Sequence, residues 1–416
     1  MNIAIVCQGF DRSSLSLQPW RRIYEISRRA TRRSISVTIV SDRSCGQSEV
    51  EEIDGIQITR ISNFSLAPLM RRRELLEAIA RSKPDVVIWY GTLFSAIYLT
   101  RLKSIMKPLV WDIETGMNGI ELLRRLSLRE VFHPHHTFLL YQAFMAALPK
   151  FVIRSVANSA MISKIIVPGQ YLRESLCRLG VKESKIAIMP LAVEMNRIKN
   201  SDTSLANEKP ERESRGEAEV FTVAYMGSPC TLRGTDTLIR SIKKIVMKCK
   251  NVKVVILSRR NVSKPEIGKG YLASEEEYLK KLIRKLGVEG YVEIVSGVLN
   301  WSELKRYILT SDVIALPFEM MFSEPPLSVL EAMGLGKVVV TTNLGILPET
   351  LGKDRGVVIE PGDSDALARA ILFLYEHPKE SLQIGRNAKR FVSSLSDWDD
   401  STLDFVNLLK EVVEEA

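Results

Sequence analysis

The sequence predicts an α/β protein with two doubly wound domains, each a parallel sheet covered by helices. Short apolar runs alternate with amphipathic stretches of helical length, which is typical of βαβ units. A polar stretch, residues 200–219, interrupts this alternation, which then restarts. The length of 416 residues suits two or three domains. We expect the two domains to face each other across a cleft, with ligands at the carboxyl ends of the strands.

The first domain is predicted over residues 1–195. Apolar residues at helical spacing predict a helix over residues 17–33. Buried strands are predicted at residues 2–7, 36–40, 85–90, 108–113, 164–167 and 185–189. Residues 196–219 are predicted to be a linker or a surface loop, because this stretch holds too few large apolar side chains to order itself.

The second domain is predicted over residues 220–395, with the last residues, 396–416, carrying a C-terminal helix at 402–414. Its predicted strands are 220–226, 252–257, 291–295, 312–316 and 337–342. Its predicted helices are 235–249, 275–286, 326–334 and 363–376. Each strand is followed by a segment of helical length, so a parallel sheet is expected here as well.

The composition is that of an ordinary globular protein, with 45% hydrophobic and 26% charged residues. It excludes a disordered chain, a collagen-like repeat and a disulfide-stapled mini-protein. The five cysteines show neither pairing rhythm nor CxxC spacing, which indicates reduced thiols in a cytoplasmic protein. A predicted strand stands at the start of the chain, where a secretory signal would lie. The longest apolar run, residues 86–100, is shorter than the roughly 20 residues of a membrane-spanning helix.

Charge is distributed unevenly along the chain. The formal net charge is +9, and residues 1–200 carry 29 basic against 17 acidic side chains. Arginine pairs recur at helical spacing in residues 21–33, and three arginines stand together at 71–73. Such pairs usually form a solvated face. In a basic half they also suit an anionic membrane surface or a polyprenyl-phosphate acceptor. Nucleic acid is excluded as a partner because no recognition motif is present.

The most informative segment, residues 323–349, is predicted to form a loop, a helix, a turn, a strand and a second loop. The helix is predicted to begin near Pro326, so Leu327 and Ser328 offer backbone amides to a phosphate group at its N-terminus. Glu331 lies about one turn further on, where a carboxylate suits ribose hydroxyls. The alternative is that Glu331 is a first-turn residue stabilised by the helix dipole.

A second segment, Gly-Ser-Pro-Cys-Thr-Leu-Arg-Gly at residues 227–234, joins a predicted strand to a predicted helix. Gly227 and Gly234 permit tight turns and close backbone approach, and Arg233 can pair with a diphosphate. The alternative is an ordinary strand-to-helix loop with one solvated arginine. The segment matches neither the Walker loop nor the GxGxxG pattern.

Together these two segments resemble the C-terminal domain of retaining glycosyltransferases of the GT-B fold, family 4. Residues 171–194 resemble the family's hinge-side segment, and residues 356–371 resemble its later glycine-rich segment and helix. The resemblance covers most of the chain and is stronger after Ile162. It implies two Rossmann-like domains, with the last helix packing back on the N-terminal domain.

The resemblance implies transfer of a sugar from a GDP-, UDP- or ADP-sugar to a glycan or lipid-linked acceptor, with retention and without a bound metal or cofactor. Arg233 and Glu324 are implied as catalytic residues, the first stabilising the leaving diphosphate and the second orienting the sugar. The implied donor-binding residues are Gly227, Ser228, Arg233, Gly234, Ser323, Glu324, Leu327, Ser328 and Glu331.

The chain departs from the family pattern at three places. Ser228 stands where the family has the arginine of its phosphate clamp. Ser323 stands eight positions before Glu331, at the first glutamate of the family's Glu-x7-Glu pair, and Glu324 follows it. Either Glu324 serves instead, or Ser323 has replaced the carboxylate. Prolines also stand at positions 325 and 326, where the family often has Gly-Phe-Gly, and proline supplies no N–H.

The acceptor side is expected in the N-terminal domain. Gly9 and Phe10 follow the first predicted strand, where the family often has a glycine-rich loop. Asp112 and Glu114 end a later strand, where many members carry a histidine, and either could act at the acceptor by hydrogen bonding or as a base. The alternative is that both are solvated carboxylates. The histidine cluster at 133–136 is interpreted as a loop before a helix at 137–147, and no metal site is predicted.

Two rival functions remain open. One is another GT-B-fold enzyme, such as a sugar-nucleotide epimerase or a phosphorylase, although no pyridoxal lysine can be identified. The other is a degenerate, non-catalytic member that binds an anionic membrane or a protein partner, which Ser228, Ser323 and the missing histidine would allow.

Overall fold

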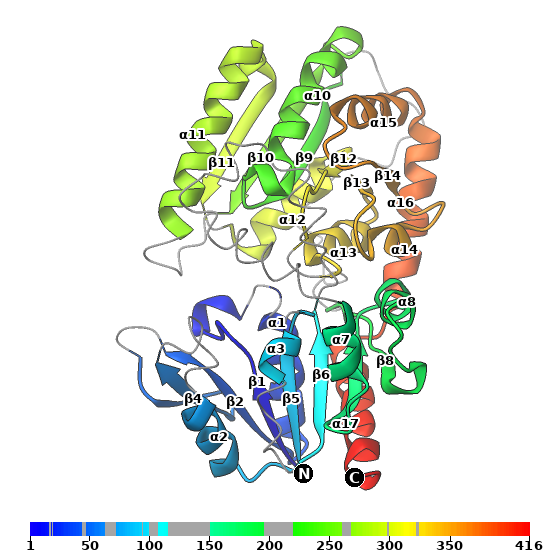
Figure 1. Cartoon of the computed structure of the whole chain (residues 1–416). Coiled ribbons are helices and arrows are strands. Elements are labelled where there is room, and N and C mark those ends of the chain that lie inside the picture. Colours follow the sequence, from blue (N-terminus) through cyan, green and yellow to red (C-terminus); the bar gives the residue numbers. More distant parts are fainter. Residues whose placement is uncertain are drawn as a thin grey trace. The chain divides into compact units, whose positions relative to one another are not determined.

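The chain forms two compact units in the computed structural model (Figure 1). Met1–Ala192, Phe322–Glu324 and Ser396–Ala416 make up the first unit, and Val193–Met321 and Pro325–Leu395 the second. The structure describes residues 1–15, 18, 20–43, 47–62, 72–93, 95–99, 107–114, 150–194, 219–259, 268–297, 299–321 and 324–416. The predicted linker at 196–219 lies outside these residues, apart from Glu219, and so does the predicted helix at 137–147.

The first unit contains an eight-stranded sheet with the order β3-β4-β2-β1-β5-β6-β7-β8. All neighbouring strands are parallel except β3, which pairs antiparallel with β4. The strands are β1 Asn2–Val6, β2 Ser36–Arg43, β3 Val50–Ile53, β4 Ile56–Ser62, β5 Val86–Gly91, β6 Leu109–Ile113, β7 Ile162–Val167 and β8 Ile186–Ile188. The central strands are buried along nearly their whole length, as expected for a parallel sheet covered on both faces.

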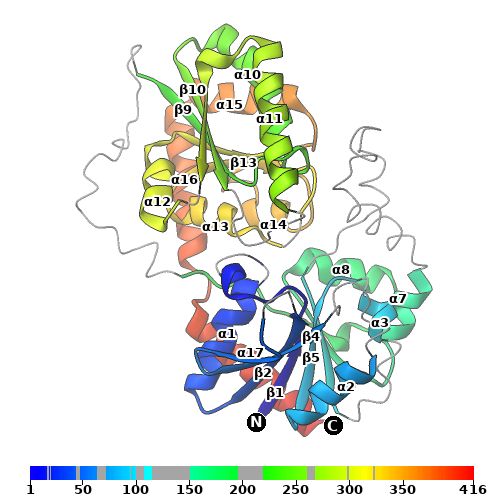
Figure 2. The same cartoon turned by 90° about the vertical axis from the view of Figure 1, so that its left-hand side faces the viewer.

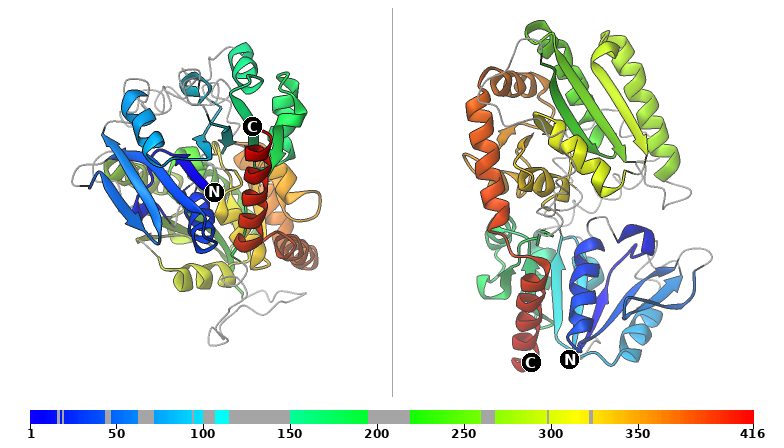
Figure 3. Two further views of the ribbon diagram at one scale, coloured as in Figure 1. Left: turned by 90° about the horizontal axis from the view of Figure 1, so that it is seen from below. Right: turned by 180° about the vertical axis from the view of Figure 1, so that it is seen from behind.

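Helices cover both faces of this sheet. They are α1 Trp20–Arg32, α2 Arg72–Arg81, α3 Ser95–Leu99, α7 Lys150–Ala157, α8 Gln170–Arg178 and α17 Trp398–Glu414. Although α17 ends the chain, it lies beside α1 within this unit (Figure 3). Asp399 of α17 forms ion pairs with Arg29 at 3.4 Å and Arg33 at 3.1 Å. These pairs connect the last helix to the first.

The second unit contains a six-stranded parallel sheet with the order β11-β10-β9-β12-β13-β14. Its first strand therefore lies in the middle, and successive strands are added first on one side and then on the other. This is the strand order of a doubly wound fold. The strands are β9 Phe221–Gly227, β10 Val252–Arg259, β11 Val292–Gly297, β12 Val313–Leu316, β13 Val338–Thr342 and β14 Val357–Ile359.

The helices of the second unit lie on both sides of its sheet, with α11 and α12 on opposite sides (Figure 2). They are α10 Thr235–Lys248, α11 Gly268–Leu286, α12 Trp301–Thr310, α13 Leu327–Gly334, α14 Leu347–Leu351, α15 Ser364–Glu376 and α16 Pro378–Ser393. Local sequence fixes where two of these helices begin. Asn300 and Glu303 form a capping box at α12, and Asp363 caps α15.

The predicted class, two doubly wound α/β domains, is confirmed. Elements that the sequence did not predict are the β3–β4 hairpin, the strand β14 and the helices α2, α3, α7, α8, α12, α14 and α16. The hairpin alternates polar and apolar residues over short runs, and charged residues dominate the exposed faces of α12 and α16. Among the described residues, no helix combines the length and the apolar character needed to cross a membrane.

Candidate functional site

The second unit brings two loops together where its strand order reverses. The strand β9 has β10 on one side and β12 on the other, so the loops after β9 and β12 leave the sheet as neighbours. The backbone N–H groups of Glu319 and Met320 both donate to the Leu232 carbonyl, at 3.2 and 2.9 Å. Ligands of doubly wound sheets bind at this kind of switch point.

The loop after β9 is held in one conformation by glycine geometry and by buried partners. Gly234 has φ +76°, and a Cβ there would lie 1.6 Å from the Pro317 carbonyl oxygen, so this position requires glycine. The Tyr225 hydroxyl donates to the Ser228 carbonyl at 2.9 Å. The loop is therefore rigid before any ligand arrives.

A buried carboxylate that the sequence did not single out supports the same loop. Thr231 donates to Glu275 Oε2 through its backbone N–H at 2.9 Å and its hydroxyl at 3.1 Å, and Glu275 is 3% exposed. These bonds fix the 3₁₀ turn Thr231–Arg233. Glu275 lies 41 residues beyond Gly234 in the chain, so no local motif indicates it.

Arg233 is the cation of this loop, at the end of the 3₁₀ turn. Its guanidinium carbon lies 5.4 Å from the centroid of the Phe318 ring, which follows β12. The ring supports the cation from a second loop, and a planar guanidinium placed in this way can pair with a diphosphate. Gly227 and Ser228 precede it at the end of β9, with Gly227 at φ +140°.

The helix α13 begins at Leu327, as the sequence predicted to within one residue, with Pro326 as its N-cap. The first hydrogen bond of the turn runs from the Val329 N–H to the Pro326 carbonyl at 3.0 Å, so the Leu327 and Ser328 amides lie ahead of the helical ladder. Glu331 lies one turn further and is half-buried. Backbone amides in this position can bind an anion, so the prediction of a phosphate site at this helix start stays open.

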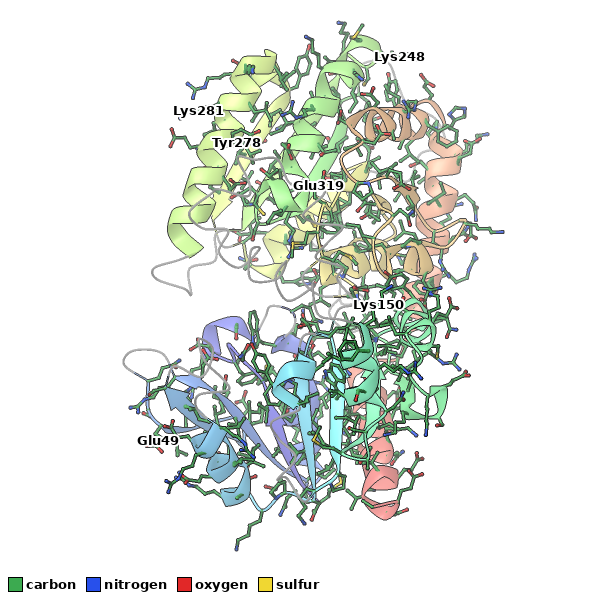
Figure 4. The ribbon with its side chains drawn as sticks, in the orientation of Figure 1. Glu49, Lys150, Lys248, Tyr278, Lys281 and Glu319 are labelled. Atoms are coloured by element: carbon green, nitrogen blue, oxygen red, sulfur yellow. The ribbon has the colours of Figure 1, made fainter. Side chains whose placement is uncertain are left out.

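The two candidates for the role of the family's first glutamate, Ser323 and Glu324, have separate outcomes. Ser323 lies outside the described residues. Glu324 is 7% exposed and groups with the first unit. Another carboxylate, Glu319 (labelled in Figure 4), stands three residues after the end of β12 and accepts a hydrogen bond from Thr237 Oγ1 at 2.8 Å. The run Pro-Phe-Glu after a buried strand could have indicated Glu319 from the sequence.

The first unit has its own switch point, between β1 and β5. The Gly9 backbone N–H donates to Asp42, and the Phe10 N–H donates to Ser41 Oγ at 3.1 Å, so the loop after β1 closes onto β2. Phe10 is 1% exposed. Its side chain therefore lies in the core, and the assignment of Phe10 to the acceptor side stays a prediction.

Asp112 at the end of β6 is buried and ion-paired. Its Oδ2 lies 2.6 Å from Arg22 Nη1 on α1, and the two side chains are 4% and 10% exposed. The reading of Asp112 as a solvated carboxylate is therefore wrong. Burial raises the pKa of Asp112, and the charge and hydrogen bond of Arg22 oppose that shift.

Glu114, two residues on, lies beside this pair. Burial raises the pKa of Glu114 well above its ordinary value, the negative charge of Asp112 adds to the shift, and Arg22 opposes it. Burial likewise raises the pKa of Tyr90, at the end of β5. A narrow pocket is lined by Gln18, Arg22, Tyr90, Asp112, Ile113, Glu114, Pro168, Met189, Leu191 and Glu324.

Four of the six arginines in residues 21–33 are buried or half-buried, so they do not form the solvated basic face that their spacing suggests, whereas Arg32 and Arg33 are exposed. Arg21 and Arg22 are 6% and 8% exposed. Arg28 and Arg29 both pair with Glu25 on the same helix. The Glu25 pairs follow from i,i+3 and i,i+4 spacing on the helix. The burial of Arg21 and Arg22 depends on how α1 packs, which spacing along one helix cannot show.

No metal site is evident in the described part of the chain, where no group of three His, Cys, Asp or Glu side chains is placed to hold an ion. The histidine cluster at 133–136 lies outside that part.

Two doubly wound sheets, each with polar groups at its switch point, agree with the GT-B fold that the sequence resemblance implies. The family described as glycosyl transferases group 1 matches residues 207–391, and glycosyltransferase family 4 matches residues 20–197. The chain belongs to this family of glycosyltransferases and is a glycosyltransferase.

Solved structures share the fold over the whole chain. Sucrose-phosphate synthase from Thermosynechococcus elongatus has a TM-score of 0.76 at 16% identity and covers 100% of both chains. Anabaena HepE, solved in complex with UDP and glucose, has a TM-score of 0.68 at 16% identity, covering 98% of this chain and 99% of that one.

A curated relative matches part of the chain. O-antigen chain mannosyltransferase B from Escherichia coli is 29% identical over 150 residues, which is 35% of this chain. The match spans 37% of that relative's length.

Proposed function

We propose that this glycosyltransferase moves a sugar from a nucleotide-sugar donor to a glycan or lipid-linked acceptor, with retention of anomeric configuration. The observation that carries the proposal is the rigid loop after β9, which holds Arg233 at the switch point of the second unit. UDP and glucose bound to the structurally similar Anabaena HepE support a donor of the same kind, a UDP-, GDP- or ADP-sugar.

The second unit would bind the donor through three groups. The Leu327 and Ser328 amides at the start of α13 suit the diphosphate, and the Arg233 guanidinium suits the charge that develops on it as the glycosidic bond breaks. Glu331 suits the ribose hydroxyls. Gly227, Ser228 and Gly234 let the backbone approach the donor closely, and Ser323 and Glu324 are assigned to the transferred sugar on the family resemblance.

The acceptor side is assigned to the first unit, at the loop of Gly9 and the end of β6. The buried thiols Cys7, Cys230 and Cys249 support a reducing, cytoplasmic location.

A donor panel tests the proposal directly. UDP-, GDP- and ADP-sugars are added to the full chain, and thermal unfolding and calorimetry identify the donor, because a ligand of the folded state raises the melting temperature. Arg233→Ala should lower kcat/KM for nucleoside diphosphate release about tenfold to a hundredfold, the cost of a lost charge-assisted hydrogen bond.

Arg240→Ala is the matched control, since Arg240 is an exposed arginine on α10 that pairs with Asp236 on its own helix. Equal turnover of Arg233→Ala and Arg240→Ala would contradict the assigned role. A wild-type chain that binds none of the nucleotide sugars would contradict the function and favour a degenerate member.

The resemblance also implies that turnover needs no divalent metal, the diphosphate charge being met by Arg233 and the helix α13. Turnover in EDTA should therefore equal turnover in Mg²⁺, and proton NMR of the product should show the anomeric configuration of the donor. Loss of turnover in EDTA that Mg²⁺ restores would contradict metal independence.

A second proposal concerns an anionic membrane surface or lipid-linked acceptor. The exposed arginines of α2, Arg72, Arg73 and Arg81, suit such a surface; Arg73 also pairs with Glu77, and Arg81 with Glu49. The triple variant to glutamine should reduce pelleting with anionic vesicles and leave the low background on neutral vesicles unchanged. Equal pelleting of wild type and variant would exclude this surface.

A further inference from the structure

Three buried polar atoms in the first unit make no hydrogen bond to any described residue and belong to residues lining one pocket. They are Gln18 Nε2, Arg22 Nη2 and Glu114 Oε1. A buried polar atom without a partner costs free energy, so such atoms are usually paired. Three at one pocket therefore point to a ligand group.

Asp112 and Arg22 have different roles at this pocket, and the sequence does not show which of them contacts a ligand. Arg22 is 8% exposed, and its Nη1 is engaged by Asp112 at 2.6 Å. The guanidinium also lies over the Tyr90 ring, 5.9 Å from its centroid, but Nη2 makes no hydrogen bond. The group offered to a ligand is therefore the guanidinium and not the Asp112 carboxylate, which instead fixes the orientation of Arg22.

The three atoms match the hydrogen-bonding capacity of one hydroxyl group. A hydroxyl oxygen accepts two hydrogen bonds and its hydrogen is donated once. Gln18 Nε2 and Arg22 Nη2 are the two donors, and Glu114 Oε1 is the acceptor. The pocket is narrow, with room for a single group of about the size of water.

We propose that Gln18, Arg22 and Glu114 bind one sugar hydroxyl of the transferred or accepting sugar, with Asp112 as the positioning residue that orients Arg22. The inference rests on the proposed function. It assigns substrate binding to Arg22 and Gln18, and it gives the ligand chemistry as a neutral hydroxyl. A sugar carboxylate fits worse, because Asp112, Glu114 and Glu324 surround the single positive charge of Arg22.

The charged and titratable groups around Glu114 influence its pKa and therefore the pH dependence of substrate binding. Asp112 on β6, Arg22 on α1 and Glu324 act on it directly. Cys7 at the end of β1 and Tyr90 on β5 also lie within its field. A hydroxyl that donates to Glu114 favours the ionised carboxylate, so binding should strengthen as pH rises through the raised pKa of Glu114 and then become constant.

The main test compares two lysine variants on the same helix. Arg22→Lys keeps a positive charge opposite Asp112 but loses the second planar donor. Arg29→Lys is the matched control, because Arg29 is also an ion-paired α1 arginine, with partners Glu25 and Asp399. We expect kcat/KM for nucleoside diphosphate release to fall about tenfold to a hundredfold in Arg22→Lys and less than about twofold in Arg29→Lys.

The substrate is the nucleotide sugar selected by the donor panel, with water alone or with p-nitrophenyl hexosides as probe acceptors. A loss with water alone assigns the hydroxyl to the transferred sugar, and a loss seen only with the hexosides assigns it to the acceptor. The Kd of the bare nucleoside diphosphate should be unchanged in both variants.

Two further variants keep the test decisive if Arg22→Lys does not fold, because neither disturbs the Arg22–Asp112 pair. Gln18→Ala should lower kcat/KM about threefold to tenfold. Glu114→Gln keeps an acceptor oxygen and should abolish the rise of kcat/KM with pH.

If the wild type is active and Arg22→Lys keeps full activity, this inference is overturned and the proposed function is not. The same holds if kcat/KM of Glu114→Gln still rises with pH. A wild-type chain that binds no nucleotide sugar overturns the proposed function and this inference with it.

Discussion

The switch points of the two sheets are built differently. In the second unit, backbone geometry makes the site: Gly234 has a positive φ, and the loops after β9 and β12 bring backbone amides and Arg233 to the switch point. In the first unit, a buried charge cluster makes it, with Arg22 and Asp112 separated by 90 residues in the sequence. The same topology thus supports a locally encoded site and one assembled by packing.

The difference shows why one site can be read from sequence and the other cannot. A glycine–arginine loop between a strand and a helix is a local feature of the chain, and it is recognised through its resemblance to the family pattern. A buried ion pair depends on which helix face packs over which strand end. A buried ion pair also affects stability more strongly when it is broken, because removing one partner leaves an uncompensated charge in the interior.

The largest effect is expected from breaking that ion pair. Arg22→Met leaves Asp112 buried without a cation and should lower the free energy of unfolding by about 3–5 kcal/mol at neutral pH. The double variant Arg22→Met/Asp112→Leu should recover most of that loss, because apolar side chains of similar size fill the site without charge. Urea denaturation measures both. A double variant as unstable as the single one would show that shape, and not charge, matters here.

The corresponding change in the second unit is Gly234→Ala. A Cβ at this position would meet the Pro317 carbonyl oxygen at 1.6 Å, in addition to the strain of φ +76°. We expect a loss of about 3 kcal/mol. Gly287→Ala is the control, with φ +67° and nothing within 4 Å of the added Cβ, and should cost only about 1 kcal/mol. Equal losses of stability for the two variants in thermal unfolding would mean that backbone strain alone, and not the contact with Pro317, destabilises the protein.

A smaller effect on stability is expected from the ionisation of Glu114. Its raised pKa means that the folded state holds the proton more tightly, so its contribution to stability is complete below the unfolded pKa of about 4.3 and is lost as pH rises through the folded pKa. Glu114→Gln stays neutral throughout. The melting temperature of the variant relative to wild type should therefore increase with pH; a constant difference across that range would contradict a buried, titrating Glu114.

The smallest effect is expected at the surface contact between α1 and α17. Burial alone would raise the pKa of Asp399, but the hydrogen bonds and charges of Arg33 and Arg29 outweigh it and lower the pKa. The Asp399 side chain is 58% exposed, so solvent screens the pair. Asp399→Asn should cost at most about 1 kcal/mol.

The effect of Asp399→Asn should disappear as pH falls through the lowered pKa of the aspartate, and in high salt. Thermal unfolding at low and high ionic strength measures it. A loss that is unchanged by salt would mean that Asp399 acts through the N-terminus of α17 instead.

The sequence by itself determined the fold class, most strands and the loop of Gly234 and Arg233, because alternating apolar runs, glycine placement and a helix start are local properties of the chain. Only the tertiary structure decided the roles of Glu275, Arg22 and Asp112. Arg22 looked like part of a solvated basic face until helix packing buried it against a strand 90 residues away. Charges at equal spacing along a helix look alike in sequence, and burial alone separates those that meet solvent from those that must find a partner.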